Sequence, residues 1–183
     1  MKKYFILYKP FLLFLTTFFF TYIVLTVLYQ EYLNSFGENK LDFITRMVGK
    51  NTNQLLRFFG FNFSIEENQT QPFIKLIFNQ KYVARIIEGC NAVSVIILFV
   101  SFVVSFSGKL KPTLFFIFGG SLLIYVLNVF RIALLCVLLF HFPKQEKLLH
   151  GVLFPLFIYG VVFILWVIWV RKFLKDASKN TKR

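Results

Sequence analysis

The chain has 183 residues, of which 57% are hydrophobic and 16% charged, and phenylalanine alone fills 27 positions. A soluble domain of this length could not cover so much apolar surface with so few charges, so lipid must be the solvent for much of the chain. The net charge is +13, which in a soluble protein would favour nucleic acid as the partner. Here the basic residues lie mostly next to apolar runs, as they do in membrane proteins, so no nucleic acid is expected.

Four apolar runs predict an all-α membrane bundle of about four transmembrane helices, in a single domain of residues 1–183. The expected spans are about 11–29, 91–106, 113–135 and 152–170. The second run is short and the third stays apolar beyond one perpendicular span, so we expect tilt, or protrusion of the third helix from the lipid.

Lysines precede the first run, at positions 2, 3 and 9, so this run could be a signal peptide. It is too long for a typical signal core, however, and no small-x-small cleavage site follows it. The sequence therefore favours an uncleaved anchor.

Basic residues set the expected orientation. With the N-terminus in the cytoplasm, the inner segments 1–10, 107–112 and 171–183 hold eleven basic residues and one acid, Asp176. The outer segments 30–90 and 141–150 hold nine basic residues and seven acids, which nearly cancel. We therefore expect a multi-pass protein of the cytoplasmic (inner) membrane with both termini in the cytoplasm.

The outer segment 30–90 is too long for a turn and predicts a small cap. An amphipathic helix is expected from apolar residues near helical spacing, namely Leu41, Ile44, Val48, Leu55 and Phe59. Two β-rich runs, 73–78 and 81–87, flank Asn79-Gln80 and predict a β-hairpin, which leads the chain to Glu88-Gly89-Cys90.

Cys90 lies where the second span is expected to begin, on the outer side. The partial positive charge and free N–H groups of a helix N-terminus favour a thiolate over a thiol, and Gly89 would let a backbone or a substrate approach closely. A small buried apolar residue is the alternative role of a lone cysteine. The other cysteine, Cys136, lies in a leucine-rich stretch and is expected to be structural. Neither a disulfide framework nor a metal site nor a cofactor is expected from two separated cysteines.

Arg131 stands inside an otherwise apolar run, near the expected outer end of the third span. Arginine within a membrane segment is costly and by default marks a functional site that faces the protein interior. Asn128 lies three residues earlier on the same helical face. Snorkelling of Arg131 to the headgroups is the alternative, but it would not explain Asn128.

His150, followed by Gly151, stands at the outer start of the fourth span, and His141 is a competitor at the end of the third. Either could be an interfacial polar residue. The topology nevertheless places Cys90, Arg131 and His150 at one interface, at the ends of three spans. A thiol, an imidazole and a guanidinium together would form a nucleophile, a general base and an oxyanion stabiliser, which is acyl-transfer chemistry.

Three short segments resemble the motifs of the exosortase/archaeosortase family in order, spacing and placement: Glu88-Gly89-Cys90-Asn91-Ala92, Asn128-Val129-Phe130-Arg131-Ile132 and His150-Gly151. The short chain and its outer segment are most similar to the compact F-type exosortase variant. The resemblance covers about residues 85–171. Asn91-Ala92 departs from the Ser-Gly that many members carry after the cysteine, so the substrate motif and the acceptor do not carry over.

The resemblance implies a membrane cysteine protease or transpeptidase that cleaves exported proteins before a C-terminal sorting tail. It implies Cys90 as the nucleophile, Arg131 as the transition-state stabiliser and His150 as the general acid and base, with Asn128, Glu88 and Gly89 in support. A non-enzymatic membrane assembly or scaffold protein stays open as the alternative. A small transporter is disfavoured because the polar residues gather at one interface and not at the midplane.

Overall fold

The computed structural model describes residues 2–37, 40–106 and 109–180, with the side chains of 8–37, 40–106 and 109–172. Parts of all three predicted inner segments (1, 107–108 and 181–183) and of the outer one (38–39) lie outside the described residues. Three helices are long and apolar enough to cross a membrane: α1 (Lys2–Asn34), α4 (Leu110–His141) and the helical stretch Pro143–Lys172 that includes α6 (Phe154–Asn180). They make the chain a multi-pass membrane protein, as the sequence predicts.

The segment expected to be the second span forms a shorter apolar helix. α3 (Val93–Ser105) has 13 residues, fewer than the about 20 that cross a bilayer as a perpendicular helix. It begins late because Ala92, the residue before it, has a left-handed backbone with φ of 64°. α4 is longer than the predicted 113–135, because no helix-breaking residue interrupts it before Pro143.

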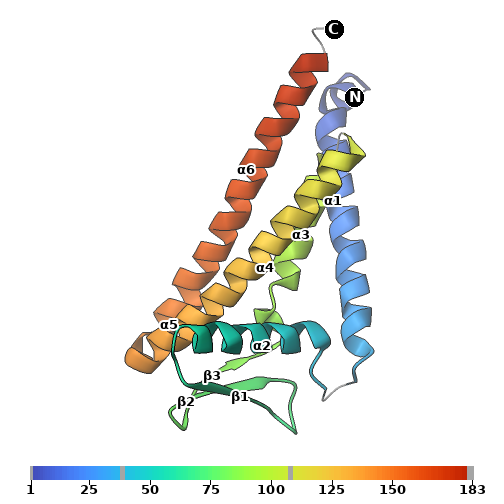
Figure 1. Cartoon of the computed structure of the whole chain (residues 1–183). Coiled ribbons are helices and arrows are strands. Elements are labelled where there is room, and N and C mark those ends of the chain that lie inside the picture. The colour runs from blue at the N-terminus through green and yellow to red at the C-terminus, as the bar shows by residue number, and fades with distance from the viewer. Residues whose placement is uncertain (1, 38–39, 107–108, 181–183) are drawn as a thin grey trace.

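The amphipathic helix is α2 (Phe43–Phe58), which lies across one end of the bundle (Figure 1). The Asp42 carboxylate begins it by accepting a hydrogen bond from the Thr45 N–H at 2.9 Å. The predicted apolar face is rotated: Ile44 and Leu55 are half-buried and Phe59 is exposed. The buried side instead carries small and mixed residues, Thr45, Val48, Gly49, Thr52 and Leu56. Small residues allow α2 to approach closely, and a Cβ on Gly49 would clash with Ile74 of the sheet.

The predicted hairpin is present, and a third strand extends it. Strands β1 (Phe63–Glu67), β2 (Ile74–Phe78) and β3 (Lys81–Ile86) form an antiparallel sheet in the order β1-β2-β3. Asn79 and Gln80 join β2 to β3 with φ of 48° and 64°, the backbone of a two-residue type I′ turn. Phe63 pairs with Phe78 at one end of β1 and Glu67 with Ile74 at the other.

Two apolar clusters hold these elements together, and α4 contributes to both. One cluster joins α2 and the sheet to the second half of α4 through residues such as Val48, Leu76 and Ile132. The other joins α3 and α6 to the first half of α4 around Phe99 and Ile124. α1 begins and α6 ends at the same end of the bundle, away from the sheet (Figure 1). We call this the terminal end, and the end that carries α2 and the sheet the Cys90 end.

Candidate functional site

A cavity of about 370 Å³ at the Cys90 end brings together the three residues that the sequence singles out. Cys90, Arg131 and His150 all line it, although they come from three separate segments of the chain. Its remaining walls come mostly from β3 and the second half of α4, with Leu76 of β2 and Glu146 completing the lining. The structure therefore brings these three residues to one common cavity.

Cys90 belongs to a tight turn and not to a membrane helix. It is the last residue of the 3-10 turn η1 (Glu88–Cys90), and α3 begins only at Val93. The N–H of Val93 is bound by the Asn91 side-chain oxygen at 2.9 Å. This corrects the expectation that Cys90 lies at the start of a helix, since the Asn91 amide already satisfies one of the free N–H groups there. Arg131 lies within electrostatic range of Cys90.

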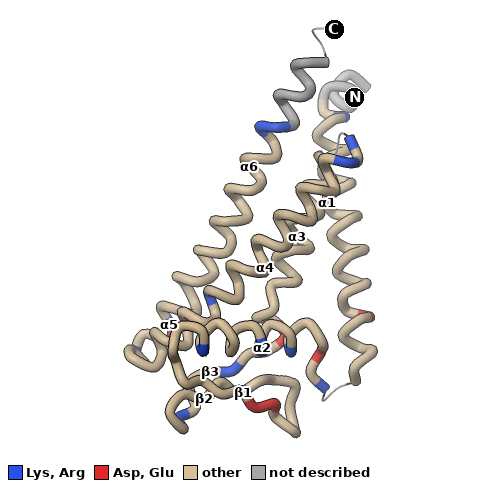
Figure 2. Tube along the Cα trace, viewed as in Figure 1, with Lys and Arg blue, Asp and Glu red and all other residues tan. Residues whose placement is uncertain are grey.

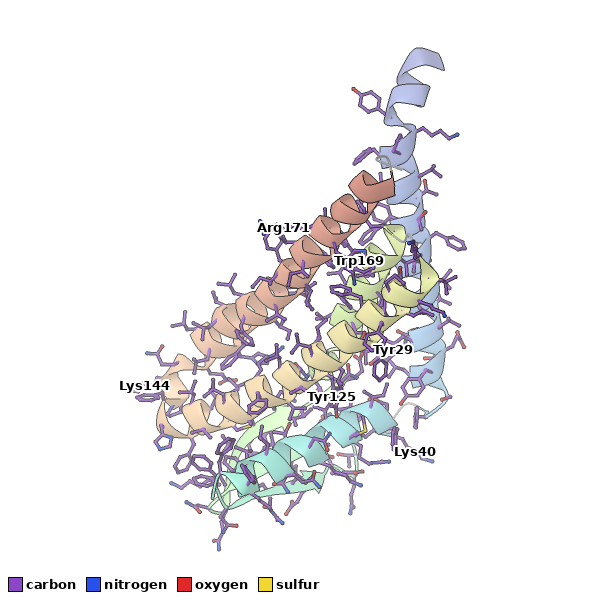
Figure 3. All side chains as sticks on the ribbon, turned by 45° about the horizontal axis from the view of Figure 1, so that its top comes forward. Tyr29, Lys40, Tyr125, Lys144, Trp169 and Arg171 are labelled. Atoms are coloured by element: carbon purple, nitrogen blue, oxygen red, sulfur yellow. The ribbon has the colours of Figure 1, made fainter. Side chains whose placement is uncertain are left out.

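One hydroxyl from α1 holds both sides of this turn. The Tyr29 hydroxyl donates a hydrogen bond to Glu88 Oε1 and accepts one from Asn91 Nδ2, each at 2.8 Å. Asn91 Nδ2 also donates to the Thr45 hydroxyl of α2 at 3.0 Å. Glu88 and Asn91, on either side of Cys90, are thus both fixed to Tyr29 of α1, which is labelled in Figure 3, and Asn91 is also fixed to α2.

Asn128 holds the turn from the opposite direction. Its Nδ2 donates to the Cys90 backbone carbonyl at 2.7 Å, and the side chain is fully buried. The sequence predicts that Asn128 orients Arg131 or donates to a reacting group, but its amide nitrogen here binds the cysteine backbone. Among the described residues, Asn128 Oδ1 has no hydrogen-bond partner.

Arg131 is half-buried and lines the cavity. It lies within range of both Cys90 and the Tyr159 hydroxyl of α6, and its buried Nε has no hydrogen-bond partner among the described residues. α4 continues past Arg131 to His141, a distance of about 15 Å along a helix axis. Arg131 therefore lies farther from the end of its helix than the predicted span 113–135 implies. Buried N–H groups rarely stay unpaired, so this Nε lacks the partner that such a group usually has.

His150 lies in a short π-helix, η3 (Leu149–Leu153), which continues from the 3-10 turn η2 (Pro143–Gln145) and α5 (Glu146–Leu148). The side chain is exposed and borders the cavity. Glu146, one helical turn earlier, borders it too. His141, the competing histidine, is exposed, and its Nδ1 lies 2.8 Å from the Val137 carbonyl, outside the described lining of this cavity.

Other residues of the cavity were not anticipated. Cys136, expected to be structural, is fully buried in the α2–sheet–α4 cluster and also borders the cavity. Tyr82 and Arg85 reach it from β3. The spacing of Glu146 and His150, four residues apart, was a signal for Glu146. No sequence signal connects Tyr29, Tyr82 or Arg85 to Cys90. Gly89 is exposed, and a Cβ there would meet no described atom, so space is open beside Cys90.

A second hollow lies on the other side of Arg131. It is an almost wholly apolar groove of about 530 Å³ between the end of α2, α4 and the start of α6. Its walls include Phe59, Phe130, Leu134 and Phe157, and Arg131 borders both this groove and the Cys90 cavity. Arg131 thus lies between a cavity of mixed polar and apolar lining and a groove that is almost wholly apolar.

Within the described residues no three His, Cys, Asp or Glu side chains gather as a metal site would require. No protein-family model, curated protein or solved structure matches this chain.

Proposed function

We propose that this protein is a membrane-embedded cysteine protease or transpeptidase that removes C-terminal sorting tails from exported proteins at the outer face of the cytoplasmic membrane. The observation that carries the proposal is the shared cavity of Cys90, Arg131 and His150. The motif resemblance of these segments to exosortases supports it.

The proposed orientation has both termini in the cytoplasm and the Cys90 end outside. α3 would be a short, fourth span, and α2 with the sheet would form the outer cap. Basic residues at the terminal end of α4 and α6 support this arrangement (Figure 2). Reporter fusions test it: fusions after Lys111 and Arg183 should report cytoplasm and one at Asn68 the outside. An outward C-terminus would contradict the proposal, because the site would face the cytoplasm.

In the proposed reaction, the Cys90 thiolate attacks the carbonyl carbon of the scissile peptide bond. His150 accepts the thiol proton, and the new S–C bond gives a tetrahedral intermediate with an oxyanion. When this intermediate collapses to the thioester, the C–N bond breaks and His150 returns the proton to the leaving amine. Water or an amine of the acceptor then attacks the thioester, which frees the thiol again. Arg131 would stabilise the oxyanion of both tetrahedral intermediates, and its place on the wall of the same cavity as Cys90 supports this role.

The supporting residues would hold the nucleophile in place. Tyr29 and Asn128 fix the turn from two sides, so the sulfur needs little reorganisation before attack. Open space beside Gly89 leaves room for a peptide. The apolar groove behind Arg131 would receive apolar residues next to the scissile bond.

Thiol labelling separates the enzyme from the scaffold alternative. In a Cys136→Ala background, a membrane-impermeant iodoacetamide reagent should label Cys90 in intact cells, about tenfold faster than a free thiol peptide at the same pH. Labelling should slow when Arg131 becomes Gln or His150 becomes Ala. Ordinary reactivity that neither variant alters would favour a scaffold. Capture of a thioester-linked peptide on Cys90, identified by mass spectrometry, would name the substrate.

A further inference from the structure

A third hollow lies between α4 and α6 at the terminal end, away from Cys90. It is a groove of about 530 Å³ whose walls are mostly apolar, with Phe115, Gly119 and Leu123 from α4 and Leu165 from α6. Two lysines, Lys111 and Lys172, complete its lining. An apolar groove between membrane helices with cations at one end matches an amphiphile in shape and charge.

The two lysines come from different helices, and a stack of rings holds one of them in place. Trp169 of α6 is buried and stacks on Phe116 of α4 with ring centroids 4.7 Å apart. The Lys172 ammonium lies over the Trp169 ring, 5.9 Å from its centroid. Lys172 is one turn after Trp169, so its side chain follows the face of α6 that meets α4. Both lysines are exposed, so a ligand can reach them.

The groove has the depth of one lipid leaflet. From Lys111 to Leu123 along α4 is about 18 Å. Half of the hydrocarbon core of a bilayer is about 15 Å thick. With the ammonium groups at headgroup level, the apolar walls therefore extend to about the bilayer midplane, as far as one acyl chain extends.

Adjacent glycines have different environments in this region. A Cβ on Gly120 would clash with the Phe99 ring, so Gly120 lets α3 and α4 meet. A Cβ on Gly119 would meet no described atom, although Gly119 borders the groove. The missing side chain at Gly119 leaves the groove open where an acyl chain would lie.

We propose that this groove binds one anionic glycerophospholipid, with its phosphate between Lys111 and Lys172 and one acyl chain along Gly119 toward Leu123. Basic pockets between membrane helices are known to bind anionic lipid headgroups. The proposal rests on the membrane helices alone and does not depend on the chemistry proposed for Cys90. In the proposed orientation, the lipid belongs to the cytoplasmic leaflet.

Native mass spectrometry of the purified full-length chain in a neutral detergent tests this, with palmitoyl-oleoyl phosphatidylglycerol as the probe. We expect one retained phosphatidylglycerol, and phosphatidylcholine with the same chains at least tenfold weaker. Each lysine should contribute about fivefold to the affinity, so Lys111→Ala/Lys172→Ala should weaken binding about 30-fold. The matched control is Lys109→Ala/Arg171→Ala, which removes equal charge at the same end. Arg171 is labelled in Figure 3 and lies two residues from Trp169, on the opposite side of the helix.

A second pair of variants tests the acyl-chain part with every lysine retained. Gly119→Leu fills the groove and should lower phosphatidylglycerol binding at least tenfold. Gly160→Leu makes the same change at an open position outside the groove lining and should leave binding unchanged. Equal loss in the two charge-matched double variants would show a diffuse attraction and overturn the proposal. Full binding by Gly119→Leu, or displacement of the lipid by millimolar inorganic phosphate, would also overturn it.

Discussion

Different kinds of interaction stabilise the two ends of the bundle. At the Cys90 end, polar side chains tie together segments that are far apart in the sequence, such as Tyr29 with Glu88 and Asn128 with Cys90. Toward the terminal end, aromatic rings pack face to face, as Phe102 does on Trp166 at 4.3 Å between centroids. α4 runs through both regions.

Hydrogen bonds fix the orientation of the groups that they join, whereas packed rings fix the side-chain volume that fits between helices. An apolar cluster tolerates an isosteric exchange, but a buried donor that loses its acceptor costs about 1–3 kcal/mol. A reacting sulfur needs a fixed direction of approach, so we expect single-atom changes to matter most at the Cys90 end. At the other end, changes of volume should matter most.

The largest expected effect is at the nucleophile. Cys90→Ala should abolish removal of the C-terminal tail, because no other residue at the turn can form the acyl-enzyme, and Cys90→Ser should be nearly inactive. Tail removal from an exported substrate is followed at matched protein levels. Cys136→Ala removes the other thiol of the cavity and should retain most activity. Normal processing by Cys90→Ala would show that the cysteine mechanism is wrong.

Arg131→Lys keeps the positive charge but loses the planar fork of donors. Loss of an oxyanion donor typically lowers the rate by about 10²–10³, and we expect that range here. Tail removal by this variant is compared with that of Lys144→Arg, an exposed exchange of the same two residue types. Equal activity of Arg131→Lys and the native chain would leave Arg131 a structural role only.

Tyr29→Phe deletes one oxygen and leaves Glu88 and Asn91 each without a hydrogen bond to α1. We expect tail removal and Cys90 alkylation to slow roughly tenfold, equivalent to about 1.4 kcal/mol. Tyr22→Phe, the same change two turns earlier on α1, is the control and should change neither rate. A fall in thermal stability with no change in the alkylation rate would argue that Tyr29 holds the fold and not the sulfur.

Gly120→Ala tests the packing toward the terminal end by adding one methyl group. The added methyl meets the Phe99 ring, and overpacking of this kind costs about 1–3 kcal/mol. Thermal unfolding in detergent should show the loss. Gly119→Ala, one residue earlier, meets open space and should raise stability by up to about 1 kcal/mol through helix propensity. Similar midpoints for both variants would contradict the packing described for Gly120.

Ala92→Gly should have the smallest effect. Ala92 has a left-handed backbone, which costs an L-residue about 1–2 kcal/mol, while the buried methyl contributes about 0.8 kcal/mol. The exchange should therefore stabilise the chain by under about 1 kcal/mol, as measured by thermal unfolding. A clear loss of stability would show that the methyl matters more than the backbone.

Periodicity and local composition predicted much of this molecule. Long apolar runs define α1, α4 and α6, and the β2–β3 hairpin follows from two apolar runs around Asn79-Gln80. β1 was missed although apolar and polar residues alternate from Phe61 to Glu66, which is itself a strand signal, and the strand pairs with β2. α2 was predicted, but its buried face was rotated, because close approach to the sheet selects small residues such as Gly49 over larger apolar ones.

The sequence predicts the site residues whose burial in a membrane helix is costly. It does not predict the residues whose role depends only on which distant segments the fold brings together. A lone arginine in an apolar run is conspicuous in sequence, so Arg131 stood out. Tyr29 did not, because tyrosine is common near membrane ends and its partners Glu88 and Asn91 are 59 and 62 residues away. Cys90 lies in a separate turn because Ala92 has a left-handed backbone. Alanine rarely adopts this conformation, so the sequence could not predict the turn.

The attachment of α1 has a mechanical consequence. Its ring contacts, Phe14 with Phe106 at 4.5 Å, lie near one end, and the Tyr29 hydroxyl lies near the other, about 22 Å away along the helix. α1 also packs against α3, so Tyr29 would move only if α1 tilts relative to α3, with Phe14 as the pivot. A helix changes its tilt when the bilayer becomes thicker or thinner, and about 5° of tilt would move Tyr29 by about 2 Å. That displacement exceeds what a hydrogen bond of 2.8 Å can absorb. A change in the thickness of the surrounding bilayer would thus strain the hydrogen bonds from Tyr29 that hold the turn around Cys90.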